Sequence, residues 1–390
     1  MNRRELMIFS GLLGLGGNGK AWSNTPEKSV NSVELPVLII GAGAAGMAAG
    51  YLLAQKGIDF HILEASSTYG GRMKRMSDFA DFPISLGAEW LHTSKRELDF
   101  IVNDEMVSIA TAMNGYTPLD RVGFYKDGKL TYHTLGEAFG PLPDLKFRDS
   151  SWLDFFDRYI VAKIRKKMQF NTEVLNVDYS GSMVCVTDSE GREYRSSKLL
   201  VTVPIQILRD NDIVFSPSLP EPHLRVLRNA PIWGGFKAFM RFSERFFPTF
   251  LMFSDSETTS GQRLYYDAGY GQKSDQHILG LFAVGKQAEP YQRLVSQNRP
   301  NYLLRELDAI FNDAASRTLM KHHIQDWNKE PFIRSAYLAD TADSNISRTL
   351  AQSIDDKIYF AGDAYTREDD WGGVHNATRS AREAVIELSA

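Results

Sequence analysis

Cysteine is almost absent from this chain, because Cys185 is the one cysteine among 390 residues. A lone cysteine cannot form an internal disulfide, and it excludes a metal site built from several thiolates, so we expect no metal. An excess of positive charge is also missing. The 44 lysines and arginines stand against 48 aspartates and glutamates, for a net charge of −4. This balance argues against a nucleic-acid partner.

Long hydrophobic runs are missing as well. Residues 6–17 are apolar, but they are too few and too rich in glycine for a stable membrane span. The basic start at residues 1–4 contains two adjacent arginines, and residues 21–23 offer the small side chains that a signal peptidase needs. The pattern predicts that residues 1–23 are a twin-arginine export signal, which implies a bacterial periplasmic location. The alternative is a disordered tail. Residues 24–33 have the composition of a polar linker.

The chain does contain enough apolar residues for a large core, at 43% of the total, and its length suggests two domains. A β-α-β unit opens it. Val37–Ile40 is a continuous apolar run, which is typical of a strand buried on both faces of a parallel sheet. Residues 44–56 follow as a helix that Gly57 stops, and Phe60–Leu63 forms a second strand.

A glycine-rich loop joins the first strand to the helix. Gly41 permits a tight turn, Gly43 lets the backbone approach a pyrophosphate, and Gly46 allows the helix to pack closely on the strand. The helix opens at Ala44 and Ala45, where unpaired N–H groups and a partial positive charge would face phosphates. The loop predicts a dinucleotide site. The alternative is an incidental glycine turn.

Glu64 and two later segments narrow the choice of dinucleotide. A carboxylate at the end of the second strand accepts both ribose hydroxyls of an adenosine and repels a 2′-phosphate. Gly71 and Arg72 bring backbone and a guanidinium toward the cofactor, where Arg72 would neutralise phosphate charge. The alternative for Arg72 is an exposed loop arginine. Far along the chain, Gly362 and Asp363 end another strand, and Asp363 would accept from ribityl hydroxyls. Together these features indicate FAD rather than NAD.

Gly373 precedes the last helix that we expect, residues 377–388. A helix that starts after Gly373 would direct its positive end at the flavin pyrimidine ring. Reduced flavin carries negative charge there, so this arrangement would stabilise the reduced state.

The predicted fold class is α/β: a Rossmann-like FAD-binding domain with a parallel sheet and a small antiparallel meander, plus an α+β substrate domain. The meander is expected within residues 172–203, whose apolar and polar residues alternate in short pieces. We expect both domains to be discontinuous in sequence. The predicted ranges are 34–95, 155–232 and 350–390 for the FAD-binding domain, and 96–154 and 233–349 for the substrate domain.

Several motifs occur in the order found in one known family. The first three are the glycine-rich loop, Glu64 and Arg72. The others are Leu86-Gly87-Ala88-Glu89-Trp90-Leu91-His92, residues 201–204, residues 213–220, Trp327 with residues 335–337, and residues 362–363. From residue 36 to the C-terminus, the chain resembles the flavin-containing amine oxidase family, which includes monoamine and polyamine oxidases. The resemblance implies that Gly87, Ala88, Glu89 and Trp90 contact the cofactor.

The resemblance also implies a reaction. A neutral amine would transfer a hydride to flavin N5, and water would hydrolyse the resulting imine. Molecular oxygen or another electron acceptor would then reoxidise the flavin, with hydrogen peroxide as the product from oxygen.

Five residues have roles implied by the resemblance, each beside an ordinary alternative. Lys237 matches the lysine that holds a water against N5, or it lies on the solvent face of a strand. Tyr337 matches one wall of an aromatic cage for the amine, and Trp327 packs beside the flavin; either ring could simply fill the core. His92 would read an amino group at the site entrance, or it would bond a backbone carbonyl. Val174 would contact the adenine through its backbone, or it is an ordinary strand residue.

The chain departs from the family pattern at three places. Val374 stands where the opposite cage wall is often aromatic. Ala336 stands where monoamine oxidases carry the cysteine that attaches the flavin, so we expect FAD to be bound noncovalently. The interval from His92 to Tyr159 is short, which implies that much of a helical substrate domain is missing. Such a site would be open, or it would be completed by an oligomer or a partner chain.

The sequence therefore predicts an exported FAD-dependent oxidase of a small-molecule amine, with polyamines among the candidates. One alternative is an amino-acid oxidase or flavin desaturase on the same scaffold. An amino-acid oxidase needs an arginine for the substrate carboxylate, and Arg263 and Arg334 are candidates. The other alternative is an FAD-bound binding protein with reduced turnover, which the short substrate domain and Val374 suggest.

Overall fold

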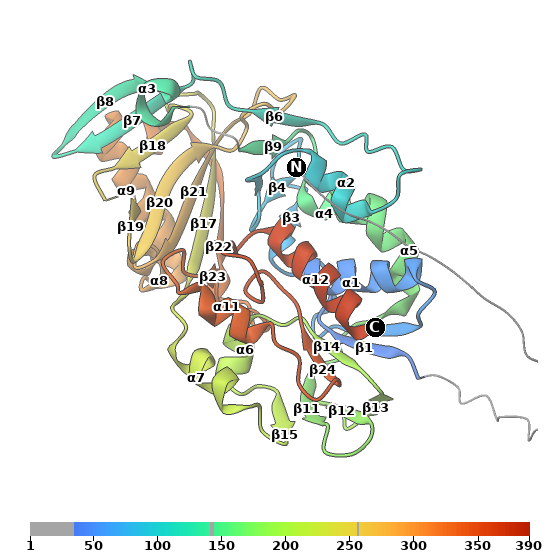
Figure 1. The fold of residues 1–390 in the computed structure, drawn as a ribbon. Helices are drawn as coiled ribbons and strands as arrows, with labels where there is room; N and C mark the ends of the chain where they lie inside the picture. Colours follow the sequence, from blue (N-terminus) through green and yellow to red (C-terminus); the bar gives the residue numbers. More distant parts are fainter. Residues whose placement is uncertain (1–34, 141–143, 256) are drawn as a thin grey trace, which may run out of the picture. The chain divides into compact units, whose positions relative to one another are not determined.

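The computed structural model describes residues 35–140, 144–255 and 257–390 (Figure 1). The predicted export signal and linker, residues 1–23 and 24–33, lie outside the described residues. Leu35–Ala390 belong to one unit by their mutual contacts, so the boundary between an FAD-binding and a substrate domain stays a prediction. In the described ranges, no helix is both long and apolar enough to cross a membrane.

Five parallel strands form one sheet in the order β10-β2-β1-β14-β24. Their bounds are β1 Val37–Ile40, β2 Phe60–Leu63, β10 Met168–Gln169, β14 Leu199–Val201 and β24 Ile358–Phe360. β1 and β2 match the two predicted strands residue for residue. Every residue of β1 is buried. On one face of the sheet, α1 (Ala44–Gln55) and α12 (Val374–Leu388) pack together over Val37 and Ile39 (Figure 1), and on the other face Leu38 and Ile40 pack in a second core cluster. The predicted Rossmann-like core is confirmed.

The predicted antiparallel meander is also confirmed. β11 (Val174–Asp178), β12 (Val184–Asp188) and β13 (Glu193–Ser196) run antiparallel in sequence order. β15 (Val214–Ser216) then pairs with β11 in parallel. Cys185, the free cysteine, lies half-buried in β12.

A second, larger sheet has the order β22-β17-β21-β20-β18-β7-β8, with β19 paired to β20 (Figure 1). Its strands are β7 Arg121–Lys126, β8 Lys129–Thr134, β17 Gly235–Phe242, β18 Phe250–Phe253, β19 Glu257–Thr258, β20 Gly261–Asp267, β21 His277–Gly285 and β22 Leu319–Asp326. Alternation along β17 directs Phe236 and Ala238 into an apolar cluster with α9 (Arg299–Phe311). Lys237 and Phe239 consequently face the other side of the sheet.

The short segment after His92 contributes strands as well as helices, because β7 and β8 extend this large sheet (Figure 1). The remaining strands are β3 Arg75–Met76, β4 Ile84–Ser85, β5 Trp90–Leu91, β6 Met113–Gly115, β9 Leu145–Phe147, β16 Ile232–Trp233 and β23 Tyr337–Leu338. The remaining α-helices are α2 Arg96–Val102, α3 Leu135–Phe139, α4 Trp152–Phe156, α5 Ala162–Ile164, α6 Ile205–Arg209, α7 Glu221–Asn229, α8 Glu289–Gln292, α10 Ala314–Thr318 and α11 Ser344–Leu350. Five single helical turns complete the described elements: η1 Gly71–Met73, η2 Asp157–Val161, η3 Arg165–Lys167, η4 Ser296–Asn298 and η5 Trp327–Lys329.

Candidate functional site

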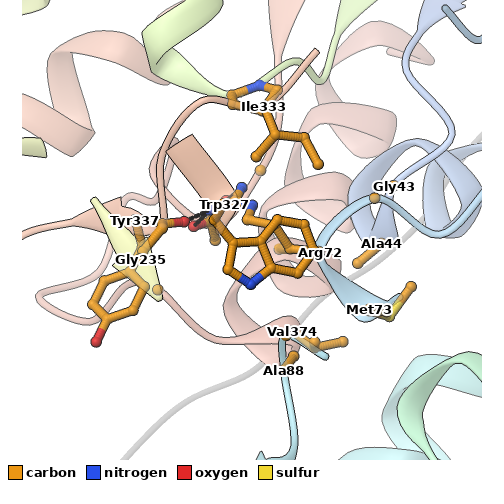
Figure 2. Close-up of a pocket in the computed structure, with 18 of the residues that line it drawn as sticks. Gly43, Ala44, Arg72, Met73, Ala88, Gly235, Trp327, Ile333, Tyr337 and Val374 are labelled. Carbon is orange, nitrogen blue, oxygen red and sulfur yellow. Dashed lines mark hydrogen bonds and ion pairs between the residues drawn. The ribbon is translucent and has the colours of Figure 1, made fainter. Parts of the chain in front are cut away.

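A large cavity of about 1230 Å³ is lined by residues of both sheets. All but one of the predicted site residues lie on its wall, and the exception is Gly46. Those on the wall are Gly41, Gly43, Ala44, Ala45, Glu64, Gly71, Arg72, Gly87, Ala88, Glu89, Trp90, His92, Val174, Lys237, Trp327, Tyr337, Gly362, Asp363, Gly373 and Val374. Figure 2 shows part of this wall, with Gly43, Arg72, Trp327 and Tyr337 around it.

The glycine loop has the geometry that its sequence requires. Gly41 adopts φ +102°, a backbone conformation that suits glycine. A Cβ on Gly46 would lie 1.9 Å from the Gly41 carbonyl oxygen, so this glycine serves packing and not the cavity. A Cβ on Gly43 would meet nothing within 4 Å, which leaves the cavity open at that point. Because Gly43 is the N-cap of α1, no side chain caps the first turn at Ala44 and Ala45.

Glu64 fastens the loop at the end of β2. One carboxylate oxygen accepts from the Ala42 N–H at 2.6 Å, and the other accepts from the N–H and the hydroxyl of Ser66 at 2.9 and 2.8 Å. The Thr172 N–H donates to the Glu64 carbonyl at 2.9 Å, which brings the start of β11, with Val174, to this end of the cavity. Glu64 and Val174, which we predicted to contact the adenosine half of FAD, therefore lie at the same end of the cavity.

Arg72 and Asp363, predicted to face different parts of the cofactor, contact each other. The guanidinium of Arg72 donates to both carboxylate oxygens of Asp363, at 2.9 and 2.5 Å, and also to the Ala336 carbonyl. Such a two-pronged pair fixes the orientation of both groups. The alternative of an exposed loop arginine is excluded, since this guanidinium is tied to the strand end that carries Asp363. Contact between Arg72 and a phosphate stays a prediction.

The last helix begins three residues earlier than predicted, at Val374. Gly373 is its N-cap, and its N–H donates to the Asn376 side chain at 2.9 Å. Val374 packs in the same core cluster that Ala88 borders, and both line the cavity (Figure 2). A Cβ on Gly372 would lie 3.4 Å from the ring of Tyr337, so backbone, and not a second aromatic ring, packs there against Tyr337.

Lys237 is buried at the cavity wall, with 3% of its surface exposed. The alternative of a solvent-facing lysine is therefore wrong. Its ammonium donates to the Ser85 carbonyl at 3.2 Å, the Gly87 carbonyl at 3.0 Å and the Glu89 carboxylate at 2.8 Å. Burial lowers the pKa of Lys237, and the negative charge of Glu89 opposes that shift.

Glu89 lines the cavity, but protein groups hold both of its carboxylate oxygens. One oxygen pairs with Lys146 at 3.0 Å, and the other accepts from Lys237 and from the hydroxyl of Tyr266. Burial alone would raise the pKa of Glu89, but the two lysines hold it below its usual value. Sequence reasoning missed Lys146 and Tyr266. Lys146 stands between two apolar residues of a short strand, a pattern that favours a solvent-facing lysine.

Trp327 and Tyr337 form an aromatic part of the wall (Figure 2). Trp327 is buried, and its indole N–H donates to the Leu86 carbonyl at 3.0 Å, which fixes the ring. Burial raises the pKa of Tyr337, so its hydroxyl stays protonated over the usual pH range. Ala336 also lines the cavity in place of a cysteine.

His92 lies at an exposed part of the wall, with 56% of its side chain accessible. Its Nδ1 lies 2.8 Å from a carboxylate oxygen of Asp144, which also lines the cavity. The alternative of a backbone carbonyl partner is therefore not what the structure shows. Asp144 was missed because only the fold brings its segment back to β5, through pairing of β5 with β9.

The residues present fit a bound FAD. The cavity runs from Glu64, where an adenosine ribose would sit, past the uncapped start of α1 to Lys237 and Tyr337. The missing Cβ atoms leave room for a pyrophosphate at Gly43, and the start of α12 would face the flavin ring. No cysteine lines the cavity within the described residues, in agreement with noncovalent attachment.

Comparison with protein families matches residues 153–388 to a family described as flavin containing amine oxidoreductase. Residues 39–101 match an NAD(P)-binding Rossmann-like domain. The chain is 23% identical to the mouse (Mus musculus) protein "Lysine-specific histone demethylase 1B" over 85% of its own length and 50% of that protein's. It thus spans about half the length of that relative. It is 21% identical to "Polyamine oxidase 4" of Oryza sativa subsp. japonica, over 90% of this chain and 88% of the relative.

Solved structures share the fold. A putrescine oxidase, solved as the wild type bound to putrescine, has a TM-score of 0.74 and 14% identity, and the match covers 92% of this chain and 99% of that one. Likeness at this identity supports the architecture alone. The family match covers more than half of the chain, and it agrees with the cavity and with FAD as the cofactor. The chain belongs to the flavin-containing amine oxidoreductase family.

Proposed function

We propose that the protein is an FAD-dependent oxidase of a small-molecule amine, producing an imine and, with oxygen as the acceptor, hydrogen peroxide. One observation carries the proposal: a single cavity is lined both by Gly43 and Glu64 of the nucleotide loop and by Lys237 and Tyr337. When bound, FAD supplies the acceptor for the hydride that leaves the carbon next to nitrogen.

The aromatic wall orients the amine. Trp327 is immobilised by its hydrogen bond to Leu86 and by burial, so it holds a fixed surface and excludes water. Tyr337 presents a neutral ring whose face attracts an amine nitrogen. In this proposal, Trp327 and Tyr337 position the substrate and perform no chemical step.

Lys237 holds and exchanges a proton at the wall. Its three ammonium hydrogens have three acceptors, namely Ser85, Gly87 and Glu89. A neutral lysine has two hydrogens and a lone pair, so loss of a proton would free one acceptor and leave a basic nitrogen at the cavity wall. Burial lowers the pKa of Lys237, which makes that loss easier than for an exposed lysine.

The structure gives less support to an amino-acid oxidase. Arg263 and Arg334, the two candidates for binding a substrate carboxylate, lie off the cavity wall. Arg263 pairs with Glu306 at 3.1 Å, and Arg334 pairs with Asp212. Among the described residues, Arg72 is the arginine that lines the cavity, and Asp363 already holds it. A substrate without a carboxylate fits this wall better.

The experiment is hydrogen peroxide release from the purified holoenzyme across monoamines, diamines, polyamines and amino acids. Diamines and polyamines head the panel because relatives include a polyamine oxidase and a fold neighbour is a putrescine oxidase. Anaerobic bleaching of the flavin absorbance is measured in parallel, since it does not depend on oxygen. Bleaching by amino acids alone would favour the amino-acid oxidase, and bleaching by none would favour the binding protein.

We further propose that residues 1–23 export the folded holoenzyme to a bacterial periplasm. The adjacent arginines support this proposal, because the twin-arginine route carries folded proteins, which suits an enzyme that loads FAD before export. Cell fractionation tests it, with both arginines changed to lysine as the comparison. Periplasmic flavoprotein that persists in this variant would remove the twin-arginine route.

A further inference from the structure

Lys146 is a second buried lysine beside the proposed proton-exchanging lysine, and 4% of its surface is exposed. It lies on β9, and it does not line the large cavity. Its ammonium donates to the Ala268 carbonyl at 2.6 Å and the Asp267 carbonyl at 3.4 Å, and it pairs with Glu89 at 3.0 Å. Three protein acceptors therefore fix Lys146 behind the cavity wall.

Glu89 stands between the two lysines. Its Oε1 pairs with Lys146 at 3.0 Å, and its Oε2 pairs with Lys237 at 2.8 Å. Two ammonium groups and one carboxylate give the cluster a formal charge of 2 − 1 = +1, and all three side chains are at most 5% exposed. The Asp267 carboxylate also feels the charge of Lys146, but it pairs with Arg245 at 2.9 Å, and this second pair adds no net charge to the cluster.

Among the residues that the structure describes, the surroundings of Lys237 supply no second counter-ion. Its partners on the neighbouring strands β21 and β22 are Phe282 and Gln325, which do not titrate. From β20, Tyr266 presents a ring 5.4 Å from the Lys237 nitrogen, and the Tyr266 hydroxyl donates to Glu89. The charge of Lys237 is therefore balanced by a carboxylate that it shares with Lys146.

We propose that Lys146 is a positioning residue for the oxidase reaction, which anchors Glu89 from behind and thereby sets how strongly Glu89 holds the proton on Lys237. The inference rests on the proposed function. Lys146 acts through Glu89 and through the repulsion between the two ammonium groups, since it does not reach the cavity. If Lys146 is removed, Glu89 serves one lysine and the repulsion between the two ammonium groups disappears. Lys237 then retains its proton to higher pH.

The pKa shifts agree with this geometry. Burial lowers the pKa of Lys237, Glu89 raises it, and the positive charge of Lys146 lowers it again. Because the folded pKa lies below the unfolded value, the folded chain binds fewer protons than the unfolded chain between the two values. The contribution of Lys237 to the stability of the wild type therefore rises with pH across that window. Without Lys146, the folded pKa of Lys237 moves closer to its unfolded value, so the increase in stability with pH becomes smaller.

The test compares Lys146→Met with Lys146→Arg, which keeps the charge, and with Lys163→Met, an exposed lysine near Asp104. One readout is the pH profile of anaerobic flavin reduction by a single amine. The other is the pH dependence of the thermal midpoint of the holoenzyme, followed by flavin fluorescence, which needs no turnover. The part of the pH–rate profile that follows deprotonation of Lys237 is its Lys237 limb. We expect Lys146→Met to move this limb to higher pH by about one pH unit. The same variant should also reduce the increase of the thermal midpoint with pH. Lys146→Arg and Lys163→Met should match the wild type.

Glu89→Gln supplies the opposite shift. This variant removes the attraction between Glu89 and Lys237 and leaves the repulsion between Lys146 and Lys237. The Lys237 limb of the pH–rate profile should therefore move to lower pH. A Lys146→Met rate lowered by one factor at every pH, with an unchanged thermal profile, would overturn the inference. So would the failure of both Lys146→Met and Lys146→Gln to fold while Lys146→Arg folds, since that result assigns Lys146 a purely structural role. If no amine reduces the wild-type flavin, the proposed function fails, and the thermal profile still decides the role of Lys146.

Discussion

Arg72 and Asp363, which lie 291 residues apart in the chain, form a two-pronged ion pair with nitrogen–oxygen distances of 2.9 and 2.5 Å. Arg72 follows the glycines after β2, and Asp363 follows β24, the edge strand of the parallel sheet. The pair therefore joins an early and a late segment of the chain, both of which line the cavity. Arg72 also donates to the Ala336 carbonyl, which ties in the strand that carries Tyr337.

Replacing Arg72 should weaken FAD binding. Arg72→Ala removes a guanidinium from the cavity wall and leaves the Asp363 carboxylate, 11% exposed, without this partner. An unpaired negative charge would then remain on the wall that we expect to hold FAD. We expect FAD affinity to fall about 10- to 100-fold, the range for charge-assisted hydrogen bonds. The measurement is a titration of the apoprotein with FAD, followed by quenching of flavin fluorescence.

Arg228→Ala is the control for that experiment. Arg228 pairs with Glu221 at 2.6 Å, but both side chains are about 60% exposed, at 60% and 59%. Exposed pairs contribute about 0–1 kcal/mol, so neither stability nor FAD affinity should change measurably. Wild-type FAD affinity in Arg72→Ala would show that the guanidinium serves only the fold.

Alanine at two glycines of the same loop should separate folding from cofactor binding. Gly46→Ala places a Cβ 1.9 Å from the Gly41 carbonyl oxygen, and backbone cannot yield cheaply. We expect it to lower the free energy of unfolding by about 1–3 kcal/mol or more. Gly43→Ala meets no protein atom within 4 Å, so the apoprotein should keep its stability. Its new methyl group occupies cofactor space, and FAD affinity should fall.

Thermal unfolding of the two apoproteins and FAD titration of each variant test Gly46→Ala and Gly43→Ala. We expect Gly46→Ala to lose stability and Gly43→Ala to lose FAD affinity. Equal destabilisation of both apoproteins would mean that the Gly43 position also needs glycine for the fold, and normal FAD affinity in Gly43→Ala would mean that no phosphate approaches there.

The shared carboxylate predicts an asymmetry in stability. Lys237→Met leaves Glu89 paired with Lys146, so the remaining cluster is neutral. Glu89→Ala leaves two buried ammonium groups with no carboxylate. Breaking a buried pair in this way costs about 3–5 kcal/mol, so Glu89→Ala should be far less stable than Lys237→Met. Chemical denaturation of both holoenzymes measures the difference.

The same Lys237→Met variant should keep FAD, because Lys237 contacts Ser85, Gly87 and Glu89 and not the nucleotide loop. Flavin reduction should nonetheless slow by about 100-fold or more, a typical contribution of a proton-transferring group. Stopped-flow reduction under anaerobic conditions checks this. Unchanged reduction and reoxidation would remove Lys237 from the mechanism.

The nucleotide half of the site could be predicted from the sequence because its signals are local. A strand of four apolar residues, three glycines and Glu64 lie within one β-α-β unit, so their relative positions follow from local geometry. The exact limits of β1 and β2 followed from the same pattern. Helix ends depend on local side-chain contacts: α12 begins three residues before the predicted start, where the Asn376 side chain accepts from the N–H of its N-cap, Gly373.

The substrate half could not be predicted to the same extent, since its contacts join distant segments. Lys146 reaches Glu89 only because β9 pairs with β5, and its apolar neighbours gave no sign of burial. Asp144 meets His92 for the same reason. The pairing of Arg72 with Asp363 likewise depends on the order of strands in the parallel sheet, which neither local segment reveals.

Two substitutions at Tyr337 should separate a substrate wall from ordinary packing. Tyr337→Phe keeps the ring that lines the cavity, and burial already keeps the native hydroxyl protonated, so KM for the amine should stay within about twofold of the wild type. Tyr337→Leu removes the ring face, worth about 0.5–2 kcal/mol for a cation or amine, so KM should rise about 2- to 30-fold. Steady-state peroxide assays and thermal midpoints of both variants decide the matter. If Tyr337→Leu lowers the midpoint while KM is unchanged, the ring only packs against Gly372 and Trp233, and the amine must be held elsewhere on the wall.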